Sequence, residues 1–357
     1  MNQAINYARY DRIRPIRWTG EALELLDQRK LPFVVEYLCC RSSDEVAAAI
    51  HALAVRGAPA IGISAAWGAV LAARDIEAAD AKAAAQALEP ALQRLNAARP
   101  TAVNLAWGID RVARKVALAE SVAEAKTIAV AEATAVAEED ELTCRRLGAF
   151  GAELFPDDCT VLTHCNAGAL ACRCRGTALG VIRSAIEAGK NVRVISCETR
   201  PLNQGSRLTC WELLRDGIDV TLIPDSSAAY LMRKGKIDLV IVGADRITKD
   251  AVFNKIGTYM HAVTARHHRI PFYVAAPVST FDLARTESEI TVEERDRAEL
   301  AWCGDRQLAP DDVKVLNYAF DATPLDLVDA IITEVGVLRP PYAASFRFIR
   351  EEEEPRR

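Results

Sequence analysis

The chain has 357 residues, of which 50% are hydrophobic and 26% are charged, and its formal net charge is −5. This length accommodates about two domains with a sizeable core. The negative balance argues against a nucleic-acid-binding surface, although a basic pocket for an anionic substrate remains compatible with it. The uncharged run over residues 58–73 is too short to span a bilayer, so we expect no membrane association.

The ten cysteines lack the spacing of a disulfide framework, which is typical of a protein from a reducing cytoplasm. Cys172 and Cys174 are separated by one residue and no CxxC pair occurs, so we expect no zinc site and no other bound metal. Residues 1–20 contain several arginines and no apolar core, and therefore do not resemble a secretory signal.

The sequence pattern of residues 1–120 predicts an N-terminal α+β domain. Three short strands are expected between residues 16 and 40, followed by a helix that begins at Ser42 or Ser43 and continues to about Val55. Further helices are expected over residues 60–74 and 79–96 and after residue 100. An alanine- and glutamate-rich helix over residues 121–150 is expected to link the two domains.

Two arginines stand just before helix starts that contain proline. Arg56 opens the segment RGAPAIG, and Arg99 opens the segment RPTAVNL. The exposed N–H groups of a helix N-terminus, joined by an arginine, form a phosphate site. The simpler interpretation makes Arg56 a charge at the end of the preceding helix. The repetition of the arrangement favours phosphate binding at both positions.

After Pro156, strands and helices alternate at the spacing of right-handed βαβ units, which predicts a parallel doubly wound sheet. Strands are expected over residues 159–163, 192–196, 220–223, 239–242, 272–275 and 313–316. Helices are expected over residues 177–188, 204–215 and 226–234, and from Pro324. The fold class is therefore α/β, with a Rossmann-like catalytic domain over residues 121–345. Residues 346–357 are expected to form an acidic tail, in which the run Glu351–Glu354 is solvated and disordered.

Polar residues follow several of these strands, and the carboxyl ends of parallel strands are where such sheets bind ligands. The main candidates are Cys165, Asp225, Asp245 and the segment 198–201. Asp245 follows the apolar run LVIVGA, so it is either a general acid with a raised pKa or a buried cap or hydrogen-bond partner. Taken alone, Cys165 is more simply interpreted as an ordinary packed residue than as a functional one. GxGxxG is absent from the first βα turn and no P-loop occurs, which argues against a dinucleotide cofactor.

Eight ordered segments resemble the S-methyl-5-thioribose-1-phosphate isomerase family. This family shares a superfamily with the regulatory subunits of the eukaryotic translation-initiation guanine-exchange factor. The resemblance covers about residues 16–342 and rests on RGAPAIG, RPTAVNL, THCNAGALA, GTALGVI, ETRPLNQGSRLT, VGADRI, NKIGTY and FYVAAPVSTFD. Two segments depart from the family pattern, Cys172–Arg175 and RITKDAVF after Asp245. Both segments would lie at the rim of the substrate pocket, and neither changes Cys165 or Asp245.

The resemblance implies a small N-terminal domain of helices with a short antiparallel sheet, a Rossmann-like C-terminal domain, and a homodimer. It implies Cys165 and Asp245 as the catalytic pair, with no cofactor. Substrate contacts are implied for seven residues: Arg56, Gly57, Ala58, Arg99, Gln204, Asn254 and Lys255.

The implied reaction converts 5-methylthioribose 1-phosphate to 5-methylthioribulose 1-phosphate in methionine salvage. Asp245 would protonate the ring oxygen, and hydrogen would then move from C2 to C1. Cys165 would act as the base, or a direct hydride shift would occur while the pair manages the hydroxyl proton. Two alternatives remain. One is an isomerase of 5-deoxyribose 1-phosphate or ribose 1,5-bisphosphate. The other is a non-catalytic regulatory subunit, which would not be expected to retain both catalytic residues and both arginine segments.

Overall fold

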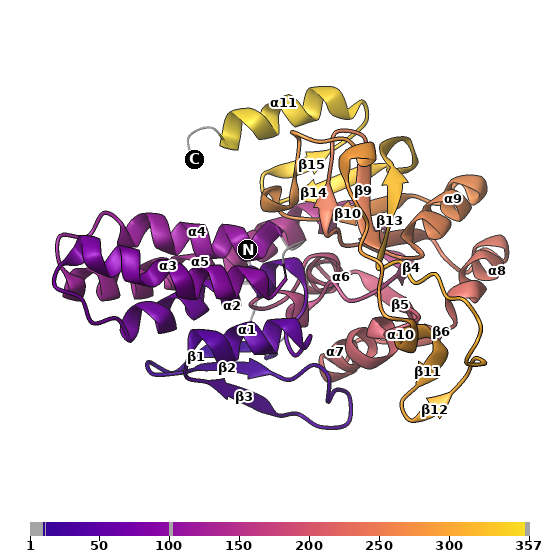
Figure 1. Ribbon diagram of the computed structural model, residues 1–357. Coiled ribbons are helices and arrows are strands. Elements are labelled where there is room, and N and C mark those ends of the chain that lie inside the picture. The colour runs from indigo at the N-terminus through magenta and orange to yellow at the C-terminus, as the bar shows by residue number, and fades with distance from the viewer. Residues whose placement is uncertain (1–9, 11, 100–102, 354–357) are drawn as a thin grey trace. The chain divides into compact units, whose positions relative to one another are not determined.

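The structure, a computed structural model, describes Tyr10 and residues 12–99 and 103–353, and it divides into two compact units (Figure 1). The first unit spans residues 1–145 and 167–179, and the second spans residues 146–166 and 180–357. The division therefore falls at residue 145 and not at the predicted residue 120. The reason is that the linking helix buries Ala125, Ala129 and Val136 in the core of the first unit.

The first unit contains the predicted three-stranded antiparallel sheet and a group of helices packed over it (Figure 1). Its strands are β1 (Ile16–Trp18), β2 (Leu23–Leu26) and β3 (Tyr37–Cys40), and its helices are α1 (Ser43–His51), α2 (Ala58–Arg74), α3 (Ala81–Ala97), α4 (Val103–Val116) and most of α5 (Val122–Ala152). Ser42 caps α1 in a capping box with Glu45, as the sequence predicts. None of the described helices is both long and apolar enough to cross a membrane.

The second unit is built on a seven-stranded sheet in the order β15-β14-β10-β7-β4-β5-β6. The strands are β4 (Asp158–Thr163), β5 (Asn191–Cys197), β6 (Val220–Ile223), β7 (Leu239–Val242), β10 (Phe272–Ala275), β14 (Ala330–Thr333) and β15 (Gly336–Leu338). All neighbours pair in parallel except β14 and β15. Read from β6, the six parallel strands follow the Rossmann order 3-2-1-4-5-6, so the direction of winding reverses between β4 and β7.

Helices cover both faces of this sheet. On one face, residues such as Leu162 and Val240 share a core with α8 (Ala228–Arg233), α9 (Thr258–His268) and α11 (Tyr342–Glu353). On the other face, α5 packs closely against α6 (Ala178–Glu187) and the sheet at Gly151. If this glycine carried a Cβ atom, the atom would lie 2.5 Å from Val181 of α6 and 3.2 Å from Ile332 of β14. The sheet is therefore doubly wound, as predicted.

Two predictions for the C-terminal third are wrong. Residues 313–316 form no strand, because Val313 and Leu316 are exposed and bury no side chain in the sheet. A strand, β13 (Phe320–Pro324), follows instead and pairs antiparallel with β9 (Ala251–Lys255), which also pairs with β8 (Arg246–Ile247). Pro324 starts no long helix, since only a 3₁₀ turn, Leu325–Leu327, separates β13 from β14.

The predicted disordered tail is also wrong as far as Glu353, because α11 extends to that residue. Phe346 and Ile349 of α11 are buried in the core of the second unit and hold the helix against it. The remaining residues, 354–357, lie outside the described part of the chain.

A buried ion cluster joins α6 to α7 (Cys210–Arg215). Arg183 Nη2 lies 3.0 Å from Glu212 Oε2 and 2.6 Å from Asp216 Oδ2, and these side chains are 0–1% exposed. The two carboxylates raise the pKa of Arg183 against the opposing effect of burial. Arg183 therefore compensates two buried carboxylates at once.

Replacing Arg183 by methionine should lower the free energy of unfolding by about 3–5 kcal/mol, because two carboxylates would be left buried without their cation. Urea unfolding at neutral pH measures the loss. The matched control is Arg94→Ala, which breaks the exposed Arg94–Asp44 pair and should cost less than about 1 kcal/mol. Equal losses in the two variants would contradict this account.

Candidate active site

The two predicted catalytic residues follow neighbouring strands of the main sheet. Leu162 of β4 pairs with Val240 of β7, and Cys165 and Asp245 stand just beyond the carboxyl ends of these strands. This is the point at which the winding of the sheet reverses, and open α/β sheets bind their ligands there. The strands that precede the two residues are therefore neighbours in the sheet.

The backbone of Cys165 is held in a left-handed conformation, with φ of 65°. Its N–H donates to Thr199 Oγ1 at 2.8 Å, and its carbonyl oxygen accepts from Thr209 Oγ1 at 2.6 Å. The residue as a whole is 8% exposed. Two hydroxyl groups therefore fix this cysteine, whose conformation L-amino acids with a side chain seldom adopt.

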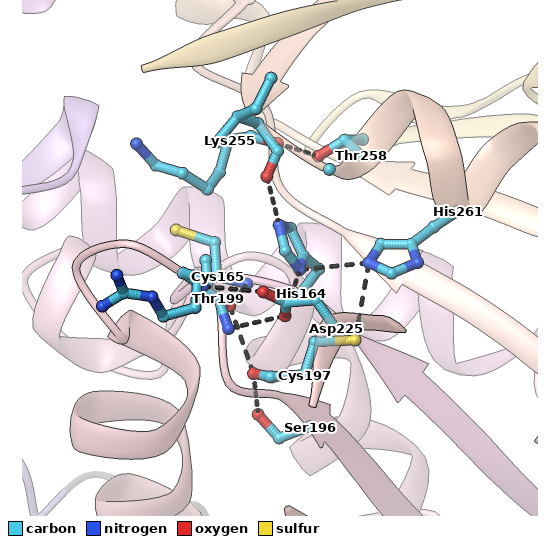
Figure 2. Close-up of polar contacts among 12 residues, drawn as sticks. His164, Cys165, Ser196, Cys197, Thr199, Asp225, Lys255, Thr258 and His261 are labelled. Atoms are coloured by element: carbon cyan, nitrogen blue, oxygen red, sulfur yellow. Dashed lines mark hydrogen bonds and ion pairs between the residues drawn. The ribbon is translucent and has the colours of Figure 1, made fainter. Parts of the chain in front are cut away.

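Thr199 is itself held by Asp225 (Figure 2). The N–H groups of Thr199 and Arg200 each donate to one oxygen of the Asp225 carboxylate at 2.8 Å. Thr199 also has a left-handed backbone, with φ of 67°, and its hydroxyl donates to the carbonyl oxygen of Cys197 at 3.2 Å. Asp225, a candidate from its position after a strand, thus supports the segment that holds Cys165.

The neighbour of Cys165 is anchored to the buried ion cluster. Asn166 Nδ2 donates to Glu212 Oε1 at 2.9 Å and lies 3.2 Å from Thr209 Oγ1. Because Arg183 fixes Glu212, the cluster supports both the stability of the second unit and the start of the loop after β4.

Asp245 begins the hairpin β8–β9. Its N–H donates to the carbonyl oxygen of Phe253 at 2.9 Å, and the residue is half-buried. The strand before it, β7, consists of four buried apolar residues. The Asp245 carboxyl group therefore follows an apolar strand at a position that solvent reaches only in part.

Asn254 and Lys255 end strand β9 beside the start of α9, where the sequence predicts substrate contacts. Asn254 Nδ2 lies 3.0 Å from Thr258 Oγ1, which donates to the carbonyl oxygen of Lys255 at 2.6 Å. Lys255 is only 8% exposed, and its Nζ donates to the carbonyl oxygen of Ala319 at 2.7 Å. This lysine is therefore a buried cation and not a solvated surface charge.

Gln204 precedes a π-helical turn, Gly205–Thr209, that leads into α7. Its side chain is buried, and among the described residues its Oε1 has no hydrogen-bond partner. A buried amide oxygen without a partner carries a desolvation cost that a substrate hydroxyl would remove. The turn requires glycine at 205, because a Cβ atom there would lie 1.7 Å from the carbonyl oxygen of Cys197.

The other predicted substrate contacts lie in the first unit. Gly57, with φ of 96°, precedes α2, and Ala58 is the first residue of that helix. A Cβ atom on Gly57 would lie 2.5 Å from Ala171, so only glycine allows this approach. Arg56 and Arg99 are both partly exposed. Pro100 and Thr101, the helix start predicted beside Arg99, lie outside the described residues.

A buried histidine pair next to Cys165 was missed by the sequence analysis (Figure 2). His164 Nε2 lies 2.8 Å from the carbonyl oxygen of Ile256, and His261 Nε2 lies 3.3 Å from His164 Nδ1 and 3.6 Å from Cys197 Sγ. The only available signal was the position of His164 at a strand end.

In the described chain, two groups of side chains have ligand atoms within 4.8 Å of one another and could hold a metal ion: His164, Cys197 and His261, and Asp140, Cys144 and Cys172.

Comparison with known proteins shows similarity over nearly the whole chain. The model of the initiation factor 2 subunit family matches residues 54–340. Methylthioribose-1-phosphate isomerase from Stenotrophomonas maltophilia is 56% identical over 351 residues, which cover 97% of this chain and 99% of the relative.

Two solved structures match with similar coverage. One is 5-methylthioribose 1-phosphate isomerase from Pyrococcus horikoshii, with a TM-score of 0.91 at 39% identity over 98% of this chain and 99% of that chain. The other, described as subunit delta of translation initiation factor eIF-2B from A. fulgidus, has a TM-score of 0.86 at 56% identity over 94% of this chain and 99% of that chain.

Replacing Thr199 by valine keeps the shape of the side chain but removes the acceptor for the Cys165 N–H. The buried N–H would lose its partner, so the free energy of unfolding should fall by about 1–3 kcal/mol in urea titrations. Thr199→Ser retains the hydroxyl and should lose less than half as much. A valine variant as stable as the serine variant would show that this hydrogen bond does not hold Cys165.

Proposed function

We propose that this chain, which belongs to the initiation factor 2 subunit family, is an aldose–ketose isomerase that converts 5-methylthioribose 1-phosphate to 5-methylthioribulose 1-phosphate. The observation that carries the proposal is the placement of Cys165 and Asp245 beyond the carboxyl ends of paired strands β4 and β7. The names of the S. maltophilia and P. horikoshii relatives support the same substrate.

Opening of the sugar ring is the first difficult step in the reaction of this substrate. Its anomeric oxygen carries phosphate, so the ring cannot open through a free anomeric hydroxyl. A proton must reach the ring oxygen while the bond between that oxygen and C1 breaks, which leaves a cationic C1. Asp245 is assigned this proton transfer, because its half-buried carboxyl group follows the apolar strand β7 at the carboxyl edge of the sheet.

Hydrogen transfer from C2 to C1 completes the reaction. In one form, the Cys165 thiolate removes the C2 proton, and the C–H electron pair forms a C1–C2 double bond. A proton then returns to C1 while the C2 hydroxyl loses its proton to the Asp245 carboxylate left by ring opening. In the other, hydride moves directly from C2 to C1, and the C2 hydroxyl loses its proton to the pair. Both forms end in a ketone at C2, and both need Cys165 held in place, which Thr199 and Thr209 achieve.

The other predicted residues are assigned to substrate binding. In the second unit, the Gln204 amide oxygen is available to a sugar hydroxyl, and Asn254 and Lys255 supply polar and cationic groups. In the first unit, the start of α2 at Gly57 and Ala58 offers exposed N–H groups to a phosphate, with Arg56 and Arg99 as cations.

We also propose a cytoplasmic homodimer. The ten cysteines are present as thiols, a state that a reducing compartment maintains. Helix α9 leaves Tyr259, Met260 and Val263 between 43% and 45% exposed on one stretch, which supports an apolar contact with a second copy.

Turnover of three sugar phosphates by the purified protein tests the substrate. 5-Methylthioribose 1-phosphate should give the highest kcat/KM. 5-Deoxyribose 1-phosphate, which lacks the methylthio group, should lose about 10-fold or more. Ribose 1,5-bisphosphate should be poorer still, because a second phosphate would replace an apolar group. The reverse order would identify a sibling isomerase, and no turnover of any of the three would favour a regulatory subunit.

Replacement of either catalytic residue tests the mechanism. Cys165→Ser and Asp245→Asn should each lower kcat by about 100-fold or more while the far-ultraviolet circular dichroism spectrum stays unchanged. The controls are Cys303→Ser and Asp305→Asn, which should retain full activity. Both residues are exposed and lie in the hairpin of β11 (Trp302–Cys303) and β12 (Arg306–Gln307). Near-normal turnover in either catalytic variant would remove that residue from the mechanism.

A further inference from the structure

The histidine pair beside Cys165 lies in the interior of the second unit, where His164 and His261 are each 1% exposed. We infer that His164 is a positioning residue that couples the Cys165 strand end to the segment 254–258, in a tautomer that the Ile256 carbonyl sets and His261 supports. The role in catalysis rests on the function proposed above, whereas the hydrogen-bond arrangement does not.

The Ile256 carbonyl decides the tautomer of His164. A carbonyl oxygen only accepts hydrogen bonds, so the hydrogen must be on Nε2 of His164, 2.8 Å away. In the neutral ring Nδ1 then carries a lone pair, and His261 Nε2, at 3.3 Å, must supply a hydrogen to it. The reverse arrangement would set the lone pair of Nε2 against the carbonyl oxygen.

The surroundings keep both rings neutral. Burial lowers the pKa of His164, and Lys255 lowers it further, although Asp225 Oδ1, 3.8 Å from Nδ1, and the Ile256 carbonyl act in the opposite direction. Burial and the neighbouring His164 lower the pKa of His261 to about 3. Because Nε2 of His261 carries the hydrogen, Cys197 Sγ, at 3.6 Å from it, accepts from the same N–H. A residue that carries protons during catalysis would need a pKa near neutral pH. The lowered pKa values of the two histidines therefore suit them to positioning and not to proton transfer.

His164 reaches the segment 254–258 by packing as well as by hydrogen bonding. A Cβ atom on Gly257, whose φ is 104°, would lie 3.1 Å from His164 Nε2 and 3.2 Å from Cε1. The ring therefore rests against the backbone at the start of α9 (Figure 2). On its other side the segment is tied to Ala319, whose carbonyl oxygen accepts from Ile256 N and Lys255 Nζ.

This contact links two parts of the proposed site. His164 is adjacent to Cys165 in the chain, and Ile256 is adjacent to Lys255. The hydrogen bond between His164 and Ile256, which are 92 positions apart in the sequence, therefore fixes Cys165 relative to Lys255. A shift of about 1 Å in such a relation can reduce turnover by about 100-fold.

Paired substitutions test the inference kinetically. Glutamine carries an N–H donor at the position of histidine Nε2, whereas leucine carries none. His164→Leu should lower kcat/KM by about 100-fold, with a fall in kcat larger than the rise in KM, and His164→Gln should stay within about 10-fold of the wild type. His261→Leu and His261→Gln should show the same order with smaller losses. His267→Gln, an exposed position on the same helix, is the control and should change nothing. Equal activity of folded leucine and glutamine variants would overturn the inference.

Nitrogen-15 NMR of the wild-type imidazoles tests the same arrangement without an activity assay. Between about pH 6 and pH 9, His164 should show hydrogen on Nε2 and none on Nδ1, and His261 should show hydrogen on Nε2. A titrating His164, hydrogen on Nδ1, or about one zinc per chain retained after dialysis would each contradict the inference. If the wild type turns over none of the sugar phosphates, the proposed function fails while this spectrum still decides the hydrogen-bond arrangement.

Discussion

The hydrogen bond from the Cys165 N–H to Thr199 Oγ1 is the interaction on which the candidate site most depends. It joins the ends of β4 and β5, and it holds a cysteine in a left-handed conformation that an unsupported loop would leave. Thr199 has the same strained backbone and relies on the Asp225 carboxylate in turn. The position of the Cys165 thiol is thus set by a series of buried polar contacts.

Each support of Cys165 is itself buried and compensated. Thr209 holds the carbonyl oxygen, and Asn166 is bound to Glu212, whose charge Arg183 balances. The His164 ring spans from the same strand end to the Ile256 carbonyl. Because an unsatisfied polar group in such a place costs about 1–3 kcal/mol, loss of one partner disturbs stability and geometry together. The geometry of the candidate site and the stability of the fold therefore depend on the same contacts.

The parallel core of the fold was predictable because its strands are short apolar runs between helices at regular spacing. The strands 220–223, 239–242 and 272–275 match the predicted limits residue for residue. The irregular C-terminal third was not predictable for two reasons. Val313 and Leu316 have the apolar pattern of a strand yet remain exposed. Phe346 and Ile349 anchor a helix, although its charged end has the sequence of a solvated tail.

In the site, Cys165 and Asp245 could be found from their places after strands. His261 could not, because its partners, His164 and Cys197, are 97 and 64 residues away along the chain and meet it only in the folded state.

A crystal structure of the Asp245→Asn variant with 5-methylthioribose 1-phosphate bound would test the central claim most directly. The account predicts that C1 and C2 of the sugar contact Cys165 Sγ and that the ring oxygen faces the substituted side chain, beyond the carboxyl ends of β4 and β7. A sugar bound away from these strand ends, with Cys165 making no contact to it, would contradict the account.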